Sequence, residues 1–208
     1  MDRIKAKNVV NRLAGIFEDK PQLKFGSPYE LLVAVILSAQ CTDERVNKVT
    51  AKLFENYGTP EKMLTLSEKE LESFIFSCGL YKTKAEHILA ATKDIVERFS
   101  GIVPSSQEEL MTLAGVGRKT ANVVYSVAFK GAAIAVDTHV FRVSNRLGLV
   151  KEKDVLKTEK SLMRVLDKSD WSRAHHYIIY LGRNFCGAKK PDCKNCPVND
   201  LCEWDKKE

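Results

Sequence analysis

Four cysteines near the end of the chain have the type and spacing of a metal site. They lie within seventeen residues of one another: Cys186, Cys193, Cys196 and Cys202. Four thiolates can hold either a zinc ion or a 4Fe-4S cluster. Structural zinc sites usually contain two short cysteine pairs, and only Cys193 and Cys196 form one here, so the spacing favours iron–sulfur and leaves zinc open. The segment has too few apolar residues to bury a core, so we expect the metal to order it.

The first two of these cysteines are separated by a loop that contains Lys189 and Lys190. A metal would hold this loop in one conformation, from which both lysines could bind phosphate groups. The alternative is that they are solvated surface charges. The formal net charge of +6 suits a polyanionic partner, because neutralised phosphates release counterions. Many soluble proteins carry a similar charge, so charge alone does not identify nucleic acid as the partner.

A second candidate site is a turn with two glycines between two predicted helices. The turn consists of Gly115, Val116 and Gly117. Glycine at both positions allows positive φ and the close approach of another backbone. Because the next helix begins at the turn, its N–H groups and the positive end of its dipole would form a phosphate site that does not read sequence. With Leu113 and Val116 as apolar anchors, the segment predicts a helix–hairpin–helix DNA-binding element.

Two basic residues follow the turn, Arg118 and Lys119. The helix dipole disfavours cations in the first turn of a helix, so an anionic ligand would compensate for them. For Lys119, the dipole together with burial would lower the pKa and provide the neutral amine that a Schiff-base nucleophile needs. The alternative is that both residues only bind phosphate.

A carboxylate is placed at the start of a further helix. The apolar segment 132–136 leads to Asp137, whose side chain can cap the backbone N–H groups of the helix that follows. A capping carboxylate is held in a fixed direction, so it could act in chemistry beside Lys119. The alternative is that Asp137 is an N-cap and nothing more.

The elements that must position these residues are helices. Almost no segment alternates apolar and polar residues as a strand does, so the predicted fold class is all-α. Cap residues, glycines and apolar periodicity predict the helices 29–39, 42–57, 60–66, 68–77, 82–99, 105–115, 117–129, 138–147, 153–166 and 172–184. No apolar run approaches the roughly 20 residues that span a bilayer, and the chain begins without a signal-like segment, so we expect a cytosolic protein with reduced thiols.

Together these segments resemble the helix–hairpin–helix DNA glycosylase superfamily, and most closely its endonuclease III family. The matching segments are 113–124, 133–146 and 186–202, and the helical layout agrees over essentially the whole chain. One departure is Ala114, where the family often has proline. Alanine at this position makes the turn less rigid but does not remove its ability to bind phosphate.

The resemblance implies a two-lobed fold with a DNA cleft between the lobes. A six-helix barrel domain would comprise 23–133 and include the helix–hairpin–helix at about 106–129. A discontinuous helical domain would comprise 1–22 and 134–208 and carry a 4Fe-4S cluster loop, 186–202. The resemblance also implies that Gln40 and Leu80 fill the gap in the duplex; from the residues alone they would be a helix-end residue and a core contact.

The function that the resemblance implies is base-excision repair. A damaged nucleotide would be flipped out of double-stranded DNA, and neutral Lys119 would attack its C1′ atom. The base would leave, and the resulting Schiff base would promote β-elimination of the 3′ phosphate. Asp137 would stabilise positive charge on the sugar and assist proton transfer. The implied lesions are oxidised or ring-saturated pyrimidines, and we expect a monomer with a structural cluster, located with DNA in the cytoplasm.

Two other functions would account for part of the pattern. A monofunctional mismatch glycosylase of the same superfamily would use water instead of an enzyme nucleophile, and Lys119 argues against it because those relatives usually carry another residue there. A non-enzymatic iron–sulfur DNA-binding module would explain the glycines and the cysteines. It would leave Lys119 and Asp137 without a role.

Overall fold

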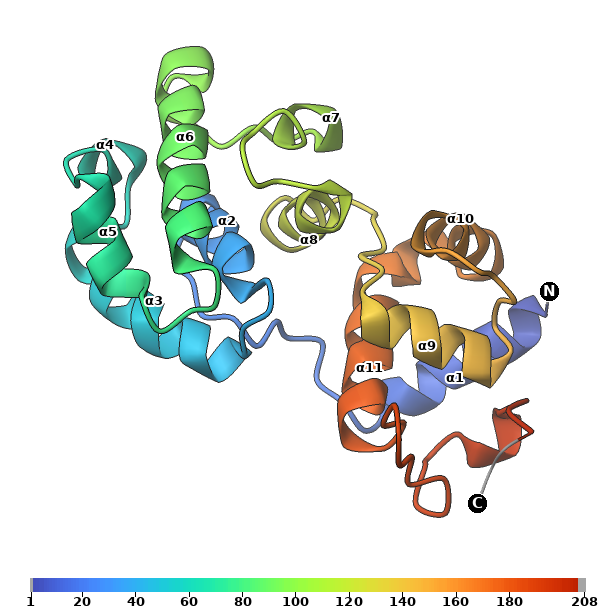
Figure 1. The fold of residues 1–208 in the computed structure, drawn as a ribbon. Helices are drawn as coiled ribbons and strands as arrows, with labels where there is room; N and C mark the ends of the chain where they lie inside the picture. The colour runs from blue at the N-terminus through green and yellow to red at the C-terminus, as the bar shows by residue number, and fades with distance from the viewer. Residues whose placement is uncertain (1, 206–208) are drawn as a thin grey trace. The chain divides into compact units, whose positions relative to one another are not determined.

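The computed structural model describes residues 2–205 of the chain. All regular structure within these residues is helical, which confirms the all-α prediction (Figure 1). The chain forms two compact units, one of Pro21–Lys130 and the other of Met1–Lys20 with Gly131–Glu208. The domains 23–133 and 1–22 with 134–208 stay a prediction. No helix in the described part of the chain is long and apolar enough to cross a membrane.

The unit Pro21–Lys130 is built around a central, buried helix. Its helices are α2 (Pro28–Ser38), α3 (Asp43–Tyr57), α4 (Pro60–Met63), α5 (Glu68–Ile75), α6 (Tyr81–Phe99), α7 (Gln107–Leu110) and α8 (Arg118–Ala128). All side chains of 31–37 in α2 are buried, and α2 packs against α3, α6 and α8. The helix begins where the sequence predicts, because Ser27 Oγ accepts a hydrogen bond from the N–H of Glu30 and Pro28 occupies the first turn.

The largest difference from the predicted helices concerns α7, which ends at Leu110 instead of near Gly115. Beyond Leu110 backbone hydrogen bonds span three residues instead of the four of an α-helix. Leu113 N–H donates to Leu110 O, and Val116 N–H donates to Leu113 O. Such three-residue bonds tighten the chain into successive turns. They bring both Leu113 and Val116 into the core, where each is buried.

The second unit packs around α11. Its helices are α1 (Arg3–Ala14), α9 (Thr138–Leu147), α10 (Val155–Val165), the short η1 (Lys168–Asp170), α11 (Trp171–Asn184) and the short η2 (Asn199–Leu201). Helix α11 packs against both α9 and α1. The core between these helices includes the buried side chains of Val9, Leu13, Val143, Ile178 and Leu181.

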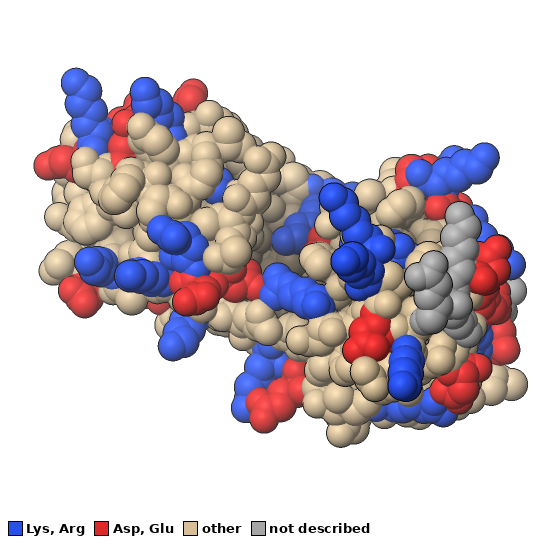
Figure 2. All heavy atoms as spheres, turned by 60° about the horizontal axis from the view of Figure 1, so that its bottom comes forward, with Lys and Arg blue, Asp and Glu red and all other residues tan. Residues whose placement is uncertain are grey.

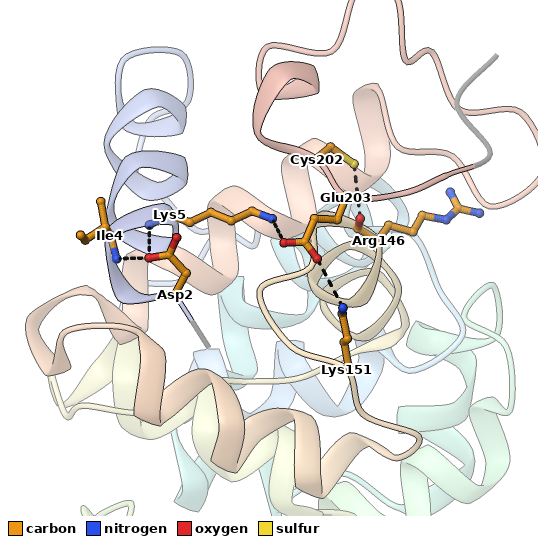
Figure 3. Close-up of polar contacts among 7 residues, drawn as sticks. All are labelled: Asp2, Ile4, Lys5, Arg146, Lys151, Cys202 and Glu203. Atoms are coloured by element: carbon orange, nitrogen blue, oxygen red, sulfur yellow. Dashed lines mark hydrogen bonds and ion pairs between the residues drawn. The ribbon is translucent and has the colours of Figure 1, made fainter.

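The segment after α11 is fixed to the rest of this unit by charged contacts (Figure 3). Lys5 Nζ on α1 lies 2.7 Å from the Glu203 carboxylate, and Lys151 Nζ lies 3.6 Å from the same group. Arg12 on α1 pairs with Asp200. Polar contacts from α1 therefore hold a tail that has few apolar residues of its own.

Candidate functional site

The glycine turn lies between α7 and α8, as predicted for a helix–hairpin–helix. Gly115 has φ +71°, and a side-chain Cβ at this position would lie 2.8 Å from His87 Cβ on α6. Any other residue would be strained in the backbone and would also collide with α6. Gln107 and the buried Asn122 are hydrogen-bonded through their side chains, which links α7 to α8.

Gly117 does not adopt the positive φ that glycine permits. Its φ of −82° and ψ of 174° are extended, and a Cβ at this position would meet nothing within 4 Å. Gly117 is instead the N-cap of α8, and no side chain caps this end of the helix. The glycine leaves open space in front of the first turn of α8, where a bulky ligand could approach the backbone N–H groups.

Arg118 and Lys119 occupy the first turn of α8, and both are exposed. The prediction that Lys119 is buried is therefore wrong for this structure. The local structure does place the amine of Lys119 in the first turn of α8, at the positive end of the helix dipole.

Gln40 and Leu80 belong to the same unit as the glycine turn, and both lie at helix ends. Gln40 follows α2 and has φ +52°; Leu80 precedes α6 and has φ +59°. Left-handed backbone is costly for residues with a side chain, so the surroundings must hold both loops in place. The Leu80 side chain is 58% exposed, so Leu80 is not the core contact that its residue type predicts.

Asp137 caps α9, as the sequence predicts. Its Oδ1 atom accepts a hydrogen bond of 2.8 Å from the backbone N–H of Val140. The second carboxylate oxygen is therefore directed by a helix end that itself rests on the buried segment Ala133–Val136. Asp137 and Lys119 belong to different units.

His139 lies two residues after Asp137, and its imidazole is partly buried. Burial lowers the pKa of His139, and the positive charges of Arg142 and Arg183 act in the same direction, against the opposing charge of Asp137. Arg142 Nη2 lies 3.2 Å from His139 Nδ1, and since arginine can only donate, Nδ1 is the acceptor. The close fit of His139 to α11 requires Gly182, where a Cβ would lie 2.9 Å from Nδ1.

The four clustered cysteines surround one pocket. Cys186, Cys193, Cys196 and Cys202 line it, together with side chains that include Phe185. None of the four forms a disulfide. Burial raises the pKa of the Cys196 thiol, and the three other cysteines add to the rise by their negative charge.

Two arginines of α9 that the sequence analysis missed hold the first part of the cysteine segment. Arg142 donates to Cys186 O from Nε and Nη2, at 3.2 and 3.0 Å. Arg146 donates to Gly187 O at 2.8 Å and to Ala188 O at 2.9 Å, and its guanidinium lies 4.0 Å from the centre of the Trp204 ring. Two arginines four residues apart on one helix face are the only sequence signal that could have indicated this contact.

Lys189 and Lys190 are both exposed at the turn between the first two cysteines. The turn is tight, since a Cβ on Gly187 would lie 2.8 Å from Lys190 O. On the face drawn in Figure 2, Lys and Arg are interspersed with Asp and Glu. The distribution of charge on this face therefore does not by itself delimit a nucleic-acid surface.

A known family matches most of the chain. Residues 33–168 match the HhH-GPD superfamily of base excision DNA repair proteins. The chain is 53% identical to endonuclease III of Bacillus subtilis over 182 residues, which cover 87% of this chain and 83% of that protein. It is 46% identical to endonuclease III of Haemophilus influenzae over 211 residues, which cover 100% and 99% of the two chains.

Solved structures with the same fold include complexes with DNA. A trapped covalent intermediate of an endonuclease III with DNA has a TM-score of 0.92 and 46% identity, and the match covers 98% of this chain and 96% of that one. A thermostable thymine-DNA glycosylase has a TM-score of 0.85 at 23% identity, with 97% and 94% covered, which shows likeness of fold alone.

The capping role of Asp137 can be separated from any other role. We expect Asp137→Ala to lower the free energy of unfolding by about 1 kcal/mol, because the N–H of Val140 loses its acceptor. Asp137→Asn keeps an acceptor oxygen and should stay within about 0.5 kcal/mol of the wild type. Urea unfolding followed by circular dichroism measures both values. Equal losses in the two variants would contradict the cap.

Proposed function

This chain belongs to the endonuclease III family within the HhH-GPD superfamily of base excision DNA repair proteins, and we propose that it removes oxidised or ring-saturated pyrimidines from duplex DNA and then cleaves the strand at the abasic site. The observation that carries the proposal is Lys119 in the first turn of α8, directly after the glycine turn. A covalent intermediate with DNA in the similar structure supports an enzyme nucleophile, because water would leave no covalent bond.

In the proposed reaction, the amine of Lys119 attacks C1′ of a flipped nucleotide, and the bond between C1′ and the base breaks. The nitrogen loses a proton and the sugar ring opens to give an imine. Loss of a proton from C2′ then breaks the bond between C3′ and the phosphate oxygen, which cleaves the strand. Water finally releases Lys119 from the sugar remnant.

We assign two tasks to Asp137. Its carboxylate stabilises the positive charge that develops on the sugar as the base leaves, and it accepts the proton that Lys119 must lose. The capping bond to Val140 supports this assignment because it fixes the direction of the carboxylate before substrate binds.

DNA binding is assigned to helix ends and exposed loops. The turn 115–117 and Arg118 would hold a phosphate through backbone N–H groups and charge. Gln40 and Leu80 would fill the space that the flipped nucleotide leaves, and Lys189 and Lys190 would contact the backbone elsewhere. We further propose that the domains are 23–133, which contains the helix–hairpin–helix, and 1–22 with 134–208.

The proposed cofactor is a 4Fe-4S cluster held by Cys186, Cys193, Cys196 and Cys202. The four cysteines line one pocket. Only Cys193 and Cys196 form the short pair that is typical of structural zinc sites, and this spacing favours a cluster over zinc. A bound cluster would link Cys186 to Cys202 and so hold the segment between them. The proposed reaction contains no redox step.

The cluster assignment predicts about four iron atoms per chain in protein purified without oxygen. Cys193→Ser should lower the iron content and destabilise the tail, whereas Cys41→Ser, which lies outside the pocket, should keep it. Elemental analysis measures both metals. Stoichiometric zinc with no iron in the wild type would contradict the assignment.

The nucleophile is tested by borohydride trapping on a duplex with one thymine glycol. Wild type should form a reduced covalent adduct, and Lys119→Gln should form none while it still binds the duplex. Lys62→Gln, an exposed lysine on α4, is the matched control and should trap like the wild type. Folded, cluster-loaded wild type that traps neither this lesion nor an abasic site would favour the monofunctional or binding-only functions.

A further inference from the structure

A buried lysine outside the proposed reaction centre joins two loops that the proposed function assigns to DNA. Lys84 on α6 is only 4% exposed. Its Nζ atom donates to Leu37 O at 2.8 Å and to Ala39 O at 2.6 Å. Lysine is almost never fully buried without partners, and here the partners are backbone carbonyls at the C-terminal end of α2.

The same residue is also bonded to the second loop. The backbone N–H of Lys84 donates to Leu80 O at 3.0 Å, in the first turn of α6. Ala39 O, which the ammonium binds, belongs to the residue directly before Gln40. One residue therefore holds the chain on one side of Gln40 through its side chain and holds Leu80 through its backbone.

The two loops are in direct contact beside Lys84. A Cβ on Gly79 would lie 3.3 Å from Gln40 O, so the absence of a side chain permits this approach. The buried thiol of Cys78 is hydrogen-bonded to Cys41, and burial raises its pKa to about 11. The chain next to Leu80 therefore packs against the loop that carries Gln40, and the chain next to Gln40 packs against the loop that carries Leu80.

We propose that Lys84 is a positioning residue that sets the spacing between Gln40 and Leu80 and so holds both ready to fill the duplex when a nucleotide is flipped. The inference rests on the proposed function of these two residues. Left-handed backbone at Gln40 and Leu80 is unfavourable unless the surroundings impose it. The ammonium imposes it at Gln40 by binding carbonyls that the ended helix leaves without partners.

Filling the buried space alone would not need the charge, because an apolar side chain of similar size avoids the cost of removing an ammonium from water. An apolar replacement would leave the carbonyls of Leu37 and Ala39 without their donor. The ammonium fixes the position of the backbone, because its two short hydrogen bonds hold residues 37–39 in one place relative to α6. The expected consequence of its loss is a displaced Gln40 loop on an otherwise folded unit.

The test compares two cleavage substrates and one fluorescence signal. The first duplex has an abasic site opposite 2-aminopurine, whose fluorescence rises when it unstacks as side chains enter the gap. The second has an abasic site opposite a tetrahydrofuran spacer, so Gln40 and Leu80 have no opposite base to displace when they fill the gap. Lys84→Met should cleave the first duplex about tenfold to a hundredfold more slowly than wild type. It should cleave the second duplex at nearly the wild-type rate, and it should produce a smaller 2-aminopurine signal.

Lys93→Met is the matched control, since Lys93 lies on the same helix with a side chain that is 66% exposed. It should behave like wild type on both duplexes. Equal cleavage of both duplexes by Lys84→Met and wild type would overturn the inference, as would an equal loss on both duplexes with an unchanged 2-aminopurine signal. Wild type that cleaves neither duplex would instead refute the proposed function.

Gly79→Ala tests the same contact from the other loop without removing a buried charge. The added Cβ would press on Gln40 O, so this variant should also lose activity on the first duplex and keep it on the second. It decides the matter if Lys84→Met does not fold. Wild-type behaviour of Gly79→Ala on both duplexes, with an unchanged fluorescence signal, would then overturn the inference.

Discussion

Backbone groups that a helix leaves without partners at its ends constrain every part of the proposed site. Four N–H groups at the start of a helix and four C=O groups at its end need partners from elsewhere. At α8 the N-cap is Gly117, which offers no side chain, so the end stays accessible to a phosphate. At α9 Asp137 supplies the partner, and at the end of α2 Lys84 supplies it. The residues that satisfy helix ends, or leave them open, are thus the residues that chemistry and binding can use.

The same constraint explains how a tail with few apolar residues is held. The backbone of the cysteine segment turns sharply and offers carbonyls that no helix satisfies. Arg142 and Arg146 bind three of these carbonyls from α9, and Arg146 Nη1 also lies 3.5 Å from Cys186 Sγ. Since Asp137 begins the helix that carries both arginines, the cysteine segment and the proposed catalytic carboxylate share one rigid support.

How much of the fold and of the site the sequence predicts depends on how few residues separate the groups that interact. Caps such as Ser27, Thr42 and Asp137 act over three residues, so the sequence predicted where those helices begin. The early end of α7 was missed because the periodicity of apolar residues cannot distinguish a helix from successive three-residue turns that bury the same side chains.

Contacts made by long cationic side chains were missed for another reason. Lys84 reaches carbonyls more than forty residues away, and Arg142 reaches one forty-four residues away, so no short pattern records either contact. Leu80 shows the opposite error, because an apolar residue beside a helix is normally buried and this one is exposed. The resemblance to a family supplied its proposed role, and residue type alone did not.

The most direct test of the account is to identify the residue that carries the sugar remnant after borohydride reduction. Proteolysis of the adduct formed with a duplex containing one abasic site, followed by mass spectrometry, locates the added mass. The account predicts the modification on Lys119 alone. A remnant on the buried Lys84, on the N-terminal amine or spread over several exposed lysines would contradict it, because the first turn of α8 would then not provide the nucleophile.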